Sequence, residues 1–280
     1  MRHGLTATTG QVLTGWTPGV SLDERGRAQA KALADRLAPV PLAAVVTSPL
    51  DRCRETAEAI IAAHVGQTGH VGQTGQTGQA GDPGHDGKPA APAVELTVDE
   101  RVGECRYGDW TGKPLAELAK DPLWPVVQAH PSAVRFPGPE GESMLDMQHR
   151  AVTAVREWND RLGKDATYLI CSHGDVIKAI VADSLGLHLD QCQRIVADPS
   201  SLTVIRYTPL RPFLLRMNDT GGGVGDLIPR PAADADQGGS ANQEGSADQT
   251  DSAEARGDAE AKAAAESDAV IGGGTGSAGG

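Results

Sequence analysis

The chain has 280 residues, which suit one large domain or two small ones. Its formal net charge of −12 argues against a nucleic-acid-binding surface, and no apolar run approaches the roughly 18 residues that a membrane helix needs. Its four cysteines are widely spaced and form no CxxC pair, so we expect a reduced, cytoplasmic protein without a zinc or dithiol site.

The acidity is concentrated at the C-terminal end. Residues 219–280 hold 12 acidic and 3 basic residues and no aromatic residue, which leaves 25 acidic and 22 basic residues in residues 1–218. Since the tail offers little to bury, we expect a folded domain over residues 1–218 and a disordered acidic tail over residues 219–280.

The first predicted elements are a helix, a strand and a second helix. Residues 21–38 have an amphipathic helical pattern, and Ser21 with Glu24 has the spacing of a capping box. Residues 42–47 form a short apolar run typical of a strand buried on both faces, and a helix is predicted over residues 50–63.

Composition changes after the second helix. Residues 65–93 contain Gly-Gln-Thr-Gly repeats and almost no large apolar side chain, which favours a disordered insertion. A folded domain tolerates such an insertion, because the entropy cost of closing a loop grows only logarithmically with its length.

Strands and helices alternate again in the remainder of the domain. We predict strands over residues 94–98, 166–172, 201–207 and 212–217, and helices over residues 114–120, 122–129, 143–162 and 175–187. This alternation indicates a three-layer α/β/α sandwich around a mostly parallel central sheet.

Two His-Gly pairs and two arginines carry the chemistry. His173 follows the most apolar predicted strand, Arg52 follows the strand at residues 42–47, and Arg2-His3-Gly4 opens the chain. Because ligand groups of α/β proteins gather at the carboxyl ends of strands, we expect these side chains to meet.

This set of side chains suits a phosphoryl group. A neutral imidazole can attack phosphorus, guanidinium groups pair with phosphate oxygens, and helix N-termini add backbone donors. The departing oxygen needs a proton, and Glu104, just beyond the strand at residues 94–98, is the acid best placed to give it. No metal or other cofactor is expected.

Six segments in this order resemble the histidine phosphatase superfamily, also called phosphoglycerate-mutase-like. The segments are Arg2-His3-Gly4, residues 22–30, Ser48 to Arg52, Glu104 to Gly112, Gly141-Glu142-Ser143 and Ser172-His173-Gly174. Within that superfamily the chain is most similar to actinobacterial proteins described as probable phosphomutases.

The resemblance implies a role for each matching residue. His3 is implied to be the nucleophile that becomes phosphorylated, with Arg2, Arg52 and His173 around the phosphate. Glu104 is implied to be the proton donor. Thr14 and Gly15 match a turn that contacts substrate in the family.

Three positions depart from the family pattern. Thr9 stands where the family usually has Asn, so weaker phosphate binding is expected there. Asp175 follows the second His-Gly, and residues 122–133 hold no arginine pair, which speaks against glycolytic mutase activity. The family's first strand precedes the Arg-His-Gly motif and is apparently truncated here, so we expect the natural start to lie upstream.

The sequence therefore predicts a phosphomonoester hydrolase that acts on a small phosphorylated metabolite through a phosphohistidine. No nucleic-acid or membrane partner is expected. A phosphomutase is one alternative, and a catalytically weak protein that binds a phosphorylated ligand is another.

Overall fold

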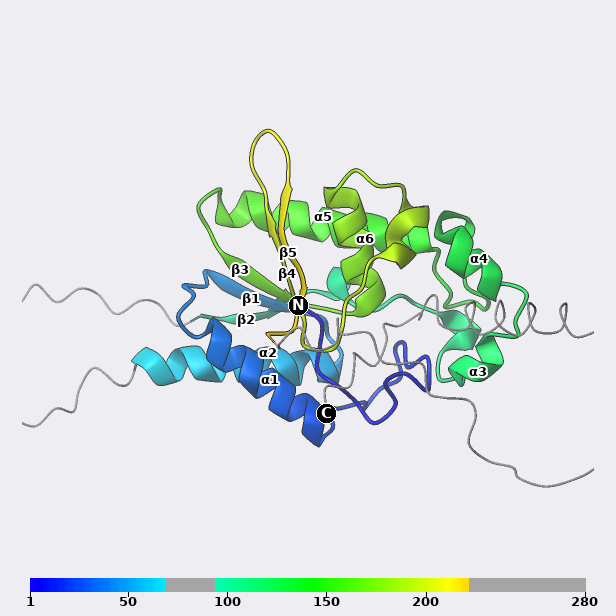
Figure 1. Cartoon of the computed structure of the whole chain (residues 1–280), viewed down its shortest axis with the longest axis horizontal. Coiled ribbons are helices and arrows are strands. Elements are labelled where there is room, and N and C mark those ends of the chain that lie inside the picture. The colour runs from blue at the N-terminus through cyan, green and yellow to red at the C-terminus, as the bar shows by residue number, and fades with distance from the viewer. Residues whose placement is uncertain (69–93, 222–280) are drawn as a thin grey trace, which may run out of the picture.

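The computed structural model describes residues 1–68 and 94–221, and a parallel sheet forms its centre (Figure 1). The strand order is β2 (Leu96–Val98), β1 (Ala44–Thr47), β3 (Tyr168–Cys171). Residues 1–3 continue the sheet beside the end of β3, where Ser172 donates to the Met1 carbonyl at 3.0 Å and accepts from the His3 amide at 3.1 Å. His3 thus lies in line with the strand ends.

A second, antiparallel sheet of two strands adjoins this edge. It consists of β4 (Leu202–Arg206) and β5 (Phe213–Asp219). The Arg2 amide donates to the Ser201 carbonyl, just before β4, at 3.1 Å. Residues 1–3 therefore lie between the parallel and the antiparallel parts, which fixes the position of the first His-Gly pair.

Helices cover both faces of the parallel sheet (Figure 1). On one face lie α1 (Glu24–Leu37) and α2 (Asp51–Thr68), and on the other α5 (Met144–Leu162) and α6 (Gly174–Ser184). These layers confirm the predicted three-layer α/β/α sandwich.

The alternation of side chains along β1 explains why both faces need a cover. Val45 is fully buried in the cluster that includes residues of α1 and α2, and Val46 is fully buried beside Trp158 of α5. Full burial of a valine contributes roughly 1.5–3 kcal/mol relative to exposure. A strand with apolar residues on both faces is therefore stable only between two layers of helices.

The helix ends agree in part with the predicted caps. Ser143 caps α5 as predicted, since its hydroxyl accepts from the Asp146 amide at 3.0 Å. The predicted cap at Ser21 is wrong, because Asp23 accepts from the Gly26 amide at 2.7 Å and α1 begins directly after it. A carboxylate competes well with a hydroxyl for this position.

The second helix is longer than predicted, since α2 continues to Thr68. The rest of the predicted insertion and nearly all of the acidic tail lie outside the described residues. Two short helices are α3 (Leu115–Leu118), whose Leu115 lines the pocket described below, and α4 (Trp124–Ala129).

No described helix is long and apolar enough to cross a membrane.

Candidate active site

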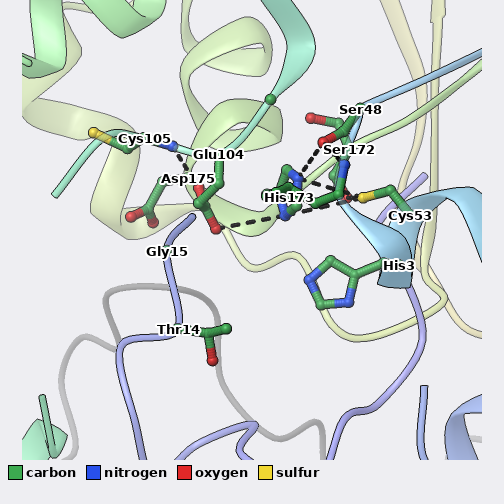
Figure 2. Close-up of polar contacts among 12 residues, drawn as sticks. His3, Thr14, Gly15, Ser48, Cys53, Glu104, Cys105, Ser172, His173 and Asp175 are labelled. Atoms are coloured by element: carbon green, nitrogen blue, oxygen red, sulfur yellow. Dashed lines mark hydrogen bonds and ion pairs between the residues drawn. The ribbon is translucent and has the colours of Figure 1, made fainter. Parts of the chain in front are cut away.

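The structure brings His3, Glu104 and His173 together near the carboxyl ends of the strands (Figure 2). Arg52 joins them, since its side chain is hydrogen-bonded to both histidines. Each lies on the segment that follows a strand end: Arg52 in the first turn of α2 after β1, Glu104 on the loop after β2, and His173 just after β3. His3 follows residues 1–2, which lie beside the end of β3. All four are at most 5% exposed. Arg2, His3, Arg52 and Glu104 line one pocket together with Thr6, Thr9, Gly10, Val12, Leu13, Thr14, Gly15, Tyr107 and Leu115.

Hydrogen bonds at His3 fix which ring nitrogen carries the hydrogen. Nδ1 lies 2.7 Å from the Gly4 carbonyl, which can only accept, so Nδ1 bears the hydrogen. Nε2 then carries the lone pair, and the Arg52 Nε–H points to it at 3.3 Å. Burial lowers the pKa of His3 well below its usual range, and Arg52 and Arg2 lower it further. The ring is therefore neutral and nucleophilic at Nε2 near pH 7.

Arg52 connects the two histidines and retains an unused donor. Its Nη2 donates to the Gly15 carbonyl at 2.9 Å and lies 3.3 Å from His173 Nδ1. Its Nη1, also buried, has no hydrogen-bond partner in the described part of the chain. A buried guanidinium nitrogen without an acceptor costs free energy, roughly 1–3 kcal/mol or more. An anion bound in the pocket removes that cost.

His173 is held neutral in a fully buried position. Its Nε2 lies 2.8 Å from Ser48 Oγ and its Nδ1 faces Arg52, an arrangement that places the hydrogen on Nε2. Burial and the charge of Arg52 lower the pKa of His173 well below its usual range. The two imidazole rings lie edge to face with centroids 5.2 Å apart. His173 thus stands beside His3 without adding positive charge.

Glu104 has the properties of a proton donor. Its Oε1 accepts from the Cys105 amide at 2.9 Å, and its Oε2 lies 3.7 Å from His173 Nδ1. Burial raises the pKa of Glu104 to about 7, and the nearby charge of Asp175 adds to the effect. A carboxyl group that is partly protonated near neutral pH can give a proton to a leaving oxygen.

Asp175 is a neighbour of Glu104 whose role the sequence did not predict. Its Oδ2 accepts from the Tyr107 hydroxyl at 2.6 Å, and Lys178 Nζ lies 3.7 Å from its Oδ1. Asp175 and Tyr107 are both buried. Their contact joins the first turn of α6 to the Glu104 segment, across 68 positions of sequence.

Uncharged groups form the rest of the pocket wall. Thr9 Oγ1 lies 2.9 Å from Thr6 Oγ1, and Thr14 Oγ1 lies 2.9 Å from Thr8 Oγ1. Gly15 has a φ of +52°, and a Cβ there would lie 3.0 Å from Tyr107 and Thr111 side-chain atoms. The turn that accepts from Arg52 therefore requires glycine.

No group of three His, Cys, Asp or Glu side chains that could hold a metal ion occurs in residues 1–68 and 94–221. The thiol of Cys53 lies 3.4 Å from His173 Nε2, and burial raises its pKa well above the usual range, so it is protonated. The chemistry that these contacts support is that of the imidazoles, guanidiniums and carboxyl described above.

Known proteins are similar to this chain in sequence. The chain is 28% identical over 188 residues to 2,3-bisphosphoglycerate-dependent phosphoglycerate mutase 2 of Gloeobacter violaceus, covering 65% of this chain and 72% of that protein. It is 29% identical over 199 residues to glucosyl-3-phosphoglycerate phosphatase of Mycolicibacterium vanbaalenii, covering 68% and 74%.

A solved structure and a family profile complete the comparison. The structure of Bacillus stearothermophilus YhfR superimposes with a TM-score of 0.61 at 28% identity, covering 78% of this chain and 94% of that one. Residues 1–70 and 88–220 match the histidine phosphatase superfamily (branch 1). The chain therefore belongs to the histidine phosphatase superfamily.

Proposed function

We propose that this protein is a phosphomonoester hydrolase that forms a covalent phosphohistidine at His3. The observation that carries the proposal is the juxtaposition of a nucleophile and an anion site. His3 Nε2 carries a lone pair, and beside it the buried Arg52 Nη1 has no acceptor among the described residues. A phosphoryl group satisfies both, since its phosphorus accepts the lone pair and its oxygens accept the guanidinium hydrogens.

In the first step the Nε2 lone pair of His3 forms a bond to phosphorus, and the bond from phosphorus to the ester oxygen breaks. Glu104 gives its proton to that oxygen, and a neutral alcohol leaves. The raised pKa of Glu104, about 7, keeps a sufficient fraction of this carboxyl protonated near neutral pH. Arg52 and Arg2 balance the charge on the phosphoryl oxygens.

In the second step water attacks the phosphorus of phospho-His3. The Glu104 carboxylate takes a proton from that water, the bond from nitrogen to phosphorus breaks, and inorganic phosphate forms. The lone pair returns to His3 Nε2 and Glu104 is again protonated. One carboxyl group therefore serves both steps, and the cycle needs no cofactor.

Hydrolysis is favoured over phosphomutase activity by the charges of the pocket. A mutase has to retain a substrate that carries a second anionic group while the phosphoryl group moves. Within the described part of the chain, Arg2 and Arg52 are the only cationic side chains that line the pocket. The similarity to a phosphoglycerate mutase keeps phosphomutase activity as the second candidate.

Phosphate release from p-nitrophenyl phosphate and from a panel of phosphomonoesters that includes 3-phosphoglycerate tests the proposal. We expect inorganic phosphate and the free alcohol as products, and loss of both in His3→Ala. Activity that survives in His3→Ala contradicts the phosphohistidine step. Conversion of 3-phosphoglycerate to an isomer without release of phosphate favours the mutase, and binding without turnover favours a ligand-binding protein.

The proposed catalytic unit is residues 1–218, and the proposed location is the cytoplasm. The match to the superfamily spans residues 1–70 and 88–220, and all four cysteines are free and buried, as suits a reducing compartment. Because β5 extends to Asp219, whose carboxylate accepts from Arg36 at 2.8 Å, the test removes residues 222–280, and the shortened chain is expected to keep the kcat/KM of the full chain.

A further inference from the structure

Arg150, on α5, holds the main chain around Glu104. Its Nη1 donates to the carbonyls of Arg101 at 2.7 Å and Gly103 at 2.8 Å, and its Nη2 donates to the carbonyl of Glu104 at 2.9 Å. Arg150 therefore contacts the segment that carries the proposed proton donor at three points. Sequence reasoning did not single out this residue.

The same guanidinium is paired with Glu142. Nε donates to Glu142 Oε2 at 3.0 Å, and Nη2 donates to Oε1 at 2.6 Å. All five N–H donors of an arginine are thus used, two on the carboxylate and three on the carbonyls. Lysine has only three donors and lacks the planar fork, so no other side chain can replace this set of bonds.

Glu142 binds the main chain on the C-terminal side of Glu104. Its Oε1 accepts from the Arg106 amide at 2.8 Å, and its own amide donates to the Arg106 carbonyl at 2.9 Å. Glu142 and Arg150 together therefore hold the backbone on both sides of Glu104. The Gly141-Glu142-Ser143 motif, which carries no part of the proposed phosphoryl transfer, gains a role in this way.

We propose that the Arg150–Glu142 pair is a positioning device, which holds the carboxyl of Glu104 where it can protonate the leaving oxygen. The inference rests on the proposed function and adds a residue to it. The two side chains are 21% and 13% exposed, so their attraction is only partly screened by water. Misplacement of a catalytic group by about 1 Å can cost about 10²-fold in rate, which makes such a device worthwhile.

The geometry predicts an effect that depends on the leaving group. An alkyl alcohol leaves only if it is protonated, whereas p-nitrophenolate leaves with little help from an acid. A variant that displaces Glu104 is therefore expected to lose more activity on an alkyl phosphate than on p-nitrophenyl phosphate. A residue that merely stabilises the fold changes both to the same extent.

The test compares Arg150→Met, Arg150→Lys and Glu142→Gln with the native chain, and Arg156→Met serves as the control. Arg156 lies on the same helix, but its partner is Asp183, and its side chain is 66% exposed. We expect Arg150→Met to lower kcat/KM on an alkyl phosphate about 100-fold and on p-nitrophenyl phosphate less than about 10-fold. Arg150→Lys is expected to recover part of the loss, and Arg156→Met to match the native chain.

Two results overturn the inference. One is an equal fall in kcat/KM on both substrates in variants whose Tm equals that of the native chain. The other is an unchanged kcat/KM on both substrates. If Arg150→Met does not fold, Glu142→Gln gives the same comparison, because its neutral amide weakens the pairing and keeps the size of the side chain.

A second measurement does not depend on turnover. Hydrogen exchange of the Arg106 amide is expected to be faster in Arg150→Met than in the native chain, and unchanged in Arg156→Met. Unchanged exchange in Arg150→Met overturns the inference whatever the activity. Faster exchange in a protein that hydrolyses no phosphomonoester instead removes the proposed function and leaves the backbone contact established.

Discussion

The inner end of the pocket and its outer wall differ in charge and in the way their atoms are held. At the inner end, Arg2, His3 and Arg52 are buried and joined by hydrogen bonds to the backbone. The outer wall consists of threonine hydroxyls and the aliphatic side chains of Val12 and Leu115. The difference indicates that charge at the inner end recognises the phosphoryl group, and that the wall distinguishes substrates by shape and by neutral hydrogen bonds.

Replacement of His3, at the inner end, is expected to cause the largest loss of activity. His3→Ala removes the proposed nucleophile and is expected to lower kcat more than about 10⁴-fold on every phosphomonoester, because no other imidazole or thiol of the described residues lines the pocket. His149→Ala, an exposed histidine of α5, is the control and is expected to keep native kcat. Trapping of a phosphorylated native enzyme, absent in His3→Ala, checks the same step.

Arg52 tests whether the inner end depends on guanidinium geometry as well as on charge. Arg52→Lys keeps a positive charge but loses the planar guanidinium, which donates to His3 and Gly15. It also loses Nη1, the buried donor that has no acceptor among the described residues. We expect kcat/KM to fall about 10²-fold, as for removal of one donor to a transition state. Arg54→Lys, an exposed position of the same helix, is the control. An equal kcat/KM in Arg52→Lys and Arg54→Lys would mean that a positive charge at residue 52 is sufficient for activity without the guanidinium geometry.

Asp175 connects the inner end to the pH dependence of the reaction. Glu104 must be protonated to act as an acid, so kcat/KM is expected to fall above its pKa of about 7. Among the charged groups near Glu104, Asp175 raises this pKa, and Arg52 and Arg2 lower it. The Cys105 amide also lowers it, and the neutral ring of His173 lies 3.7 Å from Glu104 Oε2.

Asp175→Asn removes the nearby negative charge and keeps an acceptor for the Tyr107 hydroxyl. The pKa of Glu104 therefore falls, and the alkaline limb of the kcat/KM profile is expected to move to lower pH. Asp183→Asn, on the same helix but paired with Arg156, is expected to leave the limb in place. A limb that stays at its native position in Asp175→Asn contradicts the assignment of that limb to Glu104.

The sequence was sufficient for the groups that lie at strand ends. Arg52 and His173 could be placed because each comes after a short apolar run, and parallel strands bring their carboxyl ends to one edge. No apolar run precedes His3, which was placed through the resemblance of Arg2-His3-Gly4 to the family motif. Glu104 was identified through its flanking motif, since its depth of burial has no local sequence signal. The layers of the fold also followed from the alternation of strands and helices.

Contacts between distant segments could not be predicted in this way. Tyr107 and Asp175 are 68 positions apart, and Arg150 lies 46 positions from the carbonyl of Glu104 that it contacts. Each pair depends on how α5 and α6 pack against the loop after β2, which no periodicity encodes. The cap of α1 was missed for a local reason, because Ser21 and Asp23 both fit the start of the helix and their competition is decided by backbone geometry.

Replacement of a residue of the outer wall is expected to change the kinetic constants least, and Thr9 tests this expectation. Thr9 Oγ1 accepts from the Thr6 amide at 3.0 Å and lies 2.9 Å from Thr6 Oγ1. Thr9→Val keeps the shape and removes these hydrogen bonds, together with one donor that a substrate can use. A neutral hydrogen bond contributes about 1 kcal/mol, which corresponds to about a 5-fold rise in KM.

The rise is expected in KM and not in kcat, because an uncharged hydroxyl of the pocket wall is expected to bind the ground state and the transition state equally well. Thr153→Val, a half-buried threonine of α5 that does not line the pocket, is the control for loss of a hydroxyl. A fall in kcat of the size seen for Arg52→Lys would place Thr9 with the inner end. Thr9 would then take part in the chemistry together with the charged inner end, and only the remaining neutral residues of the wall would select the substrate.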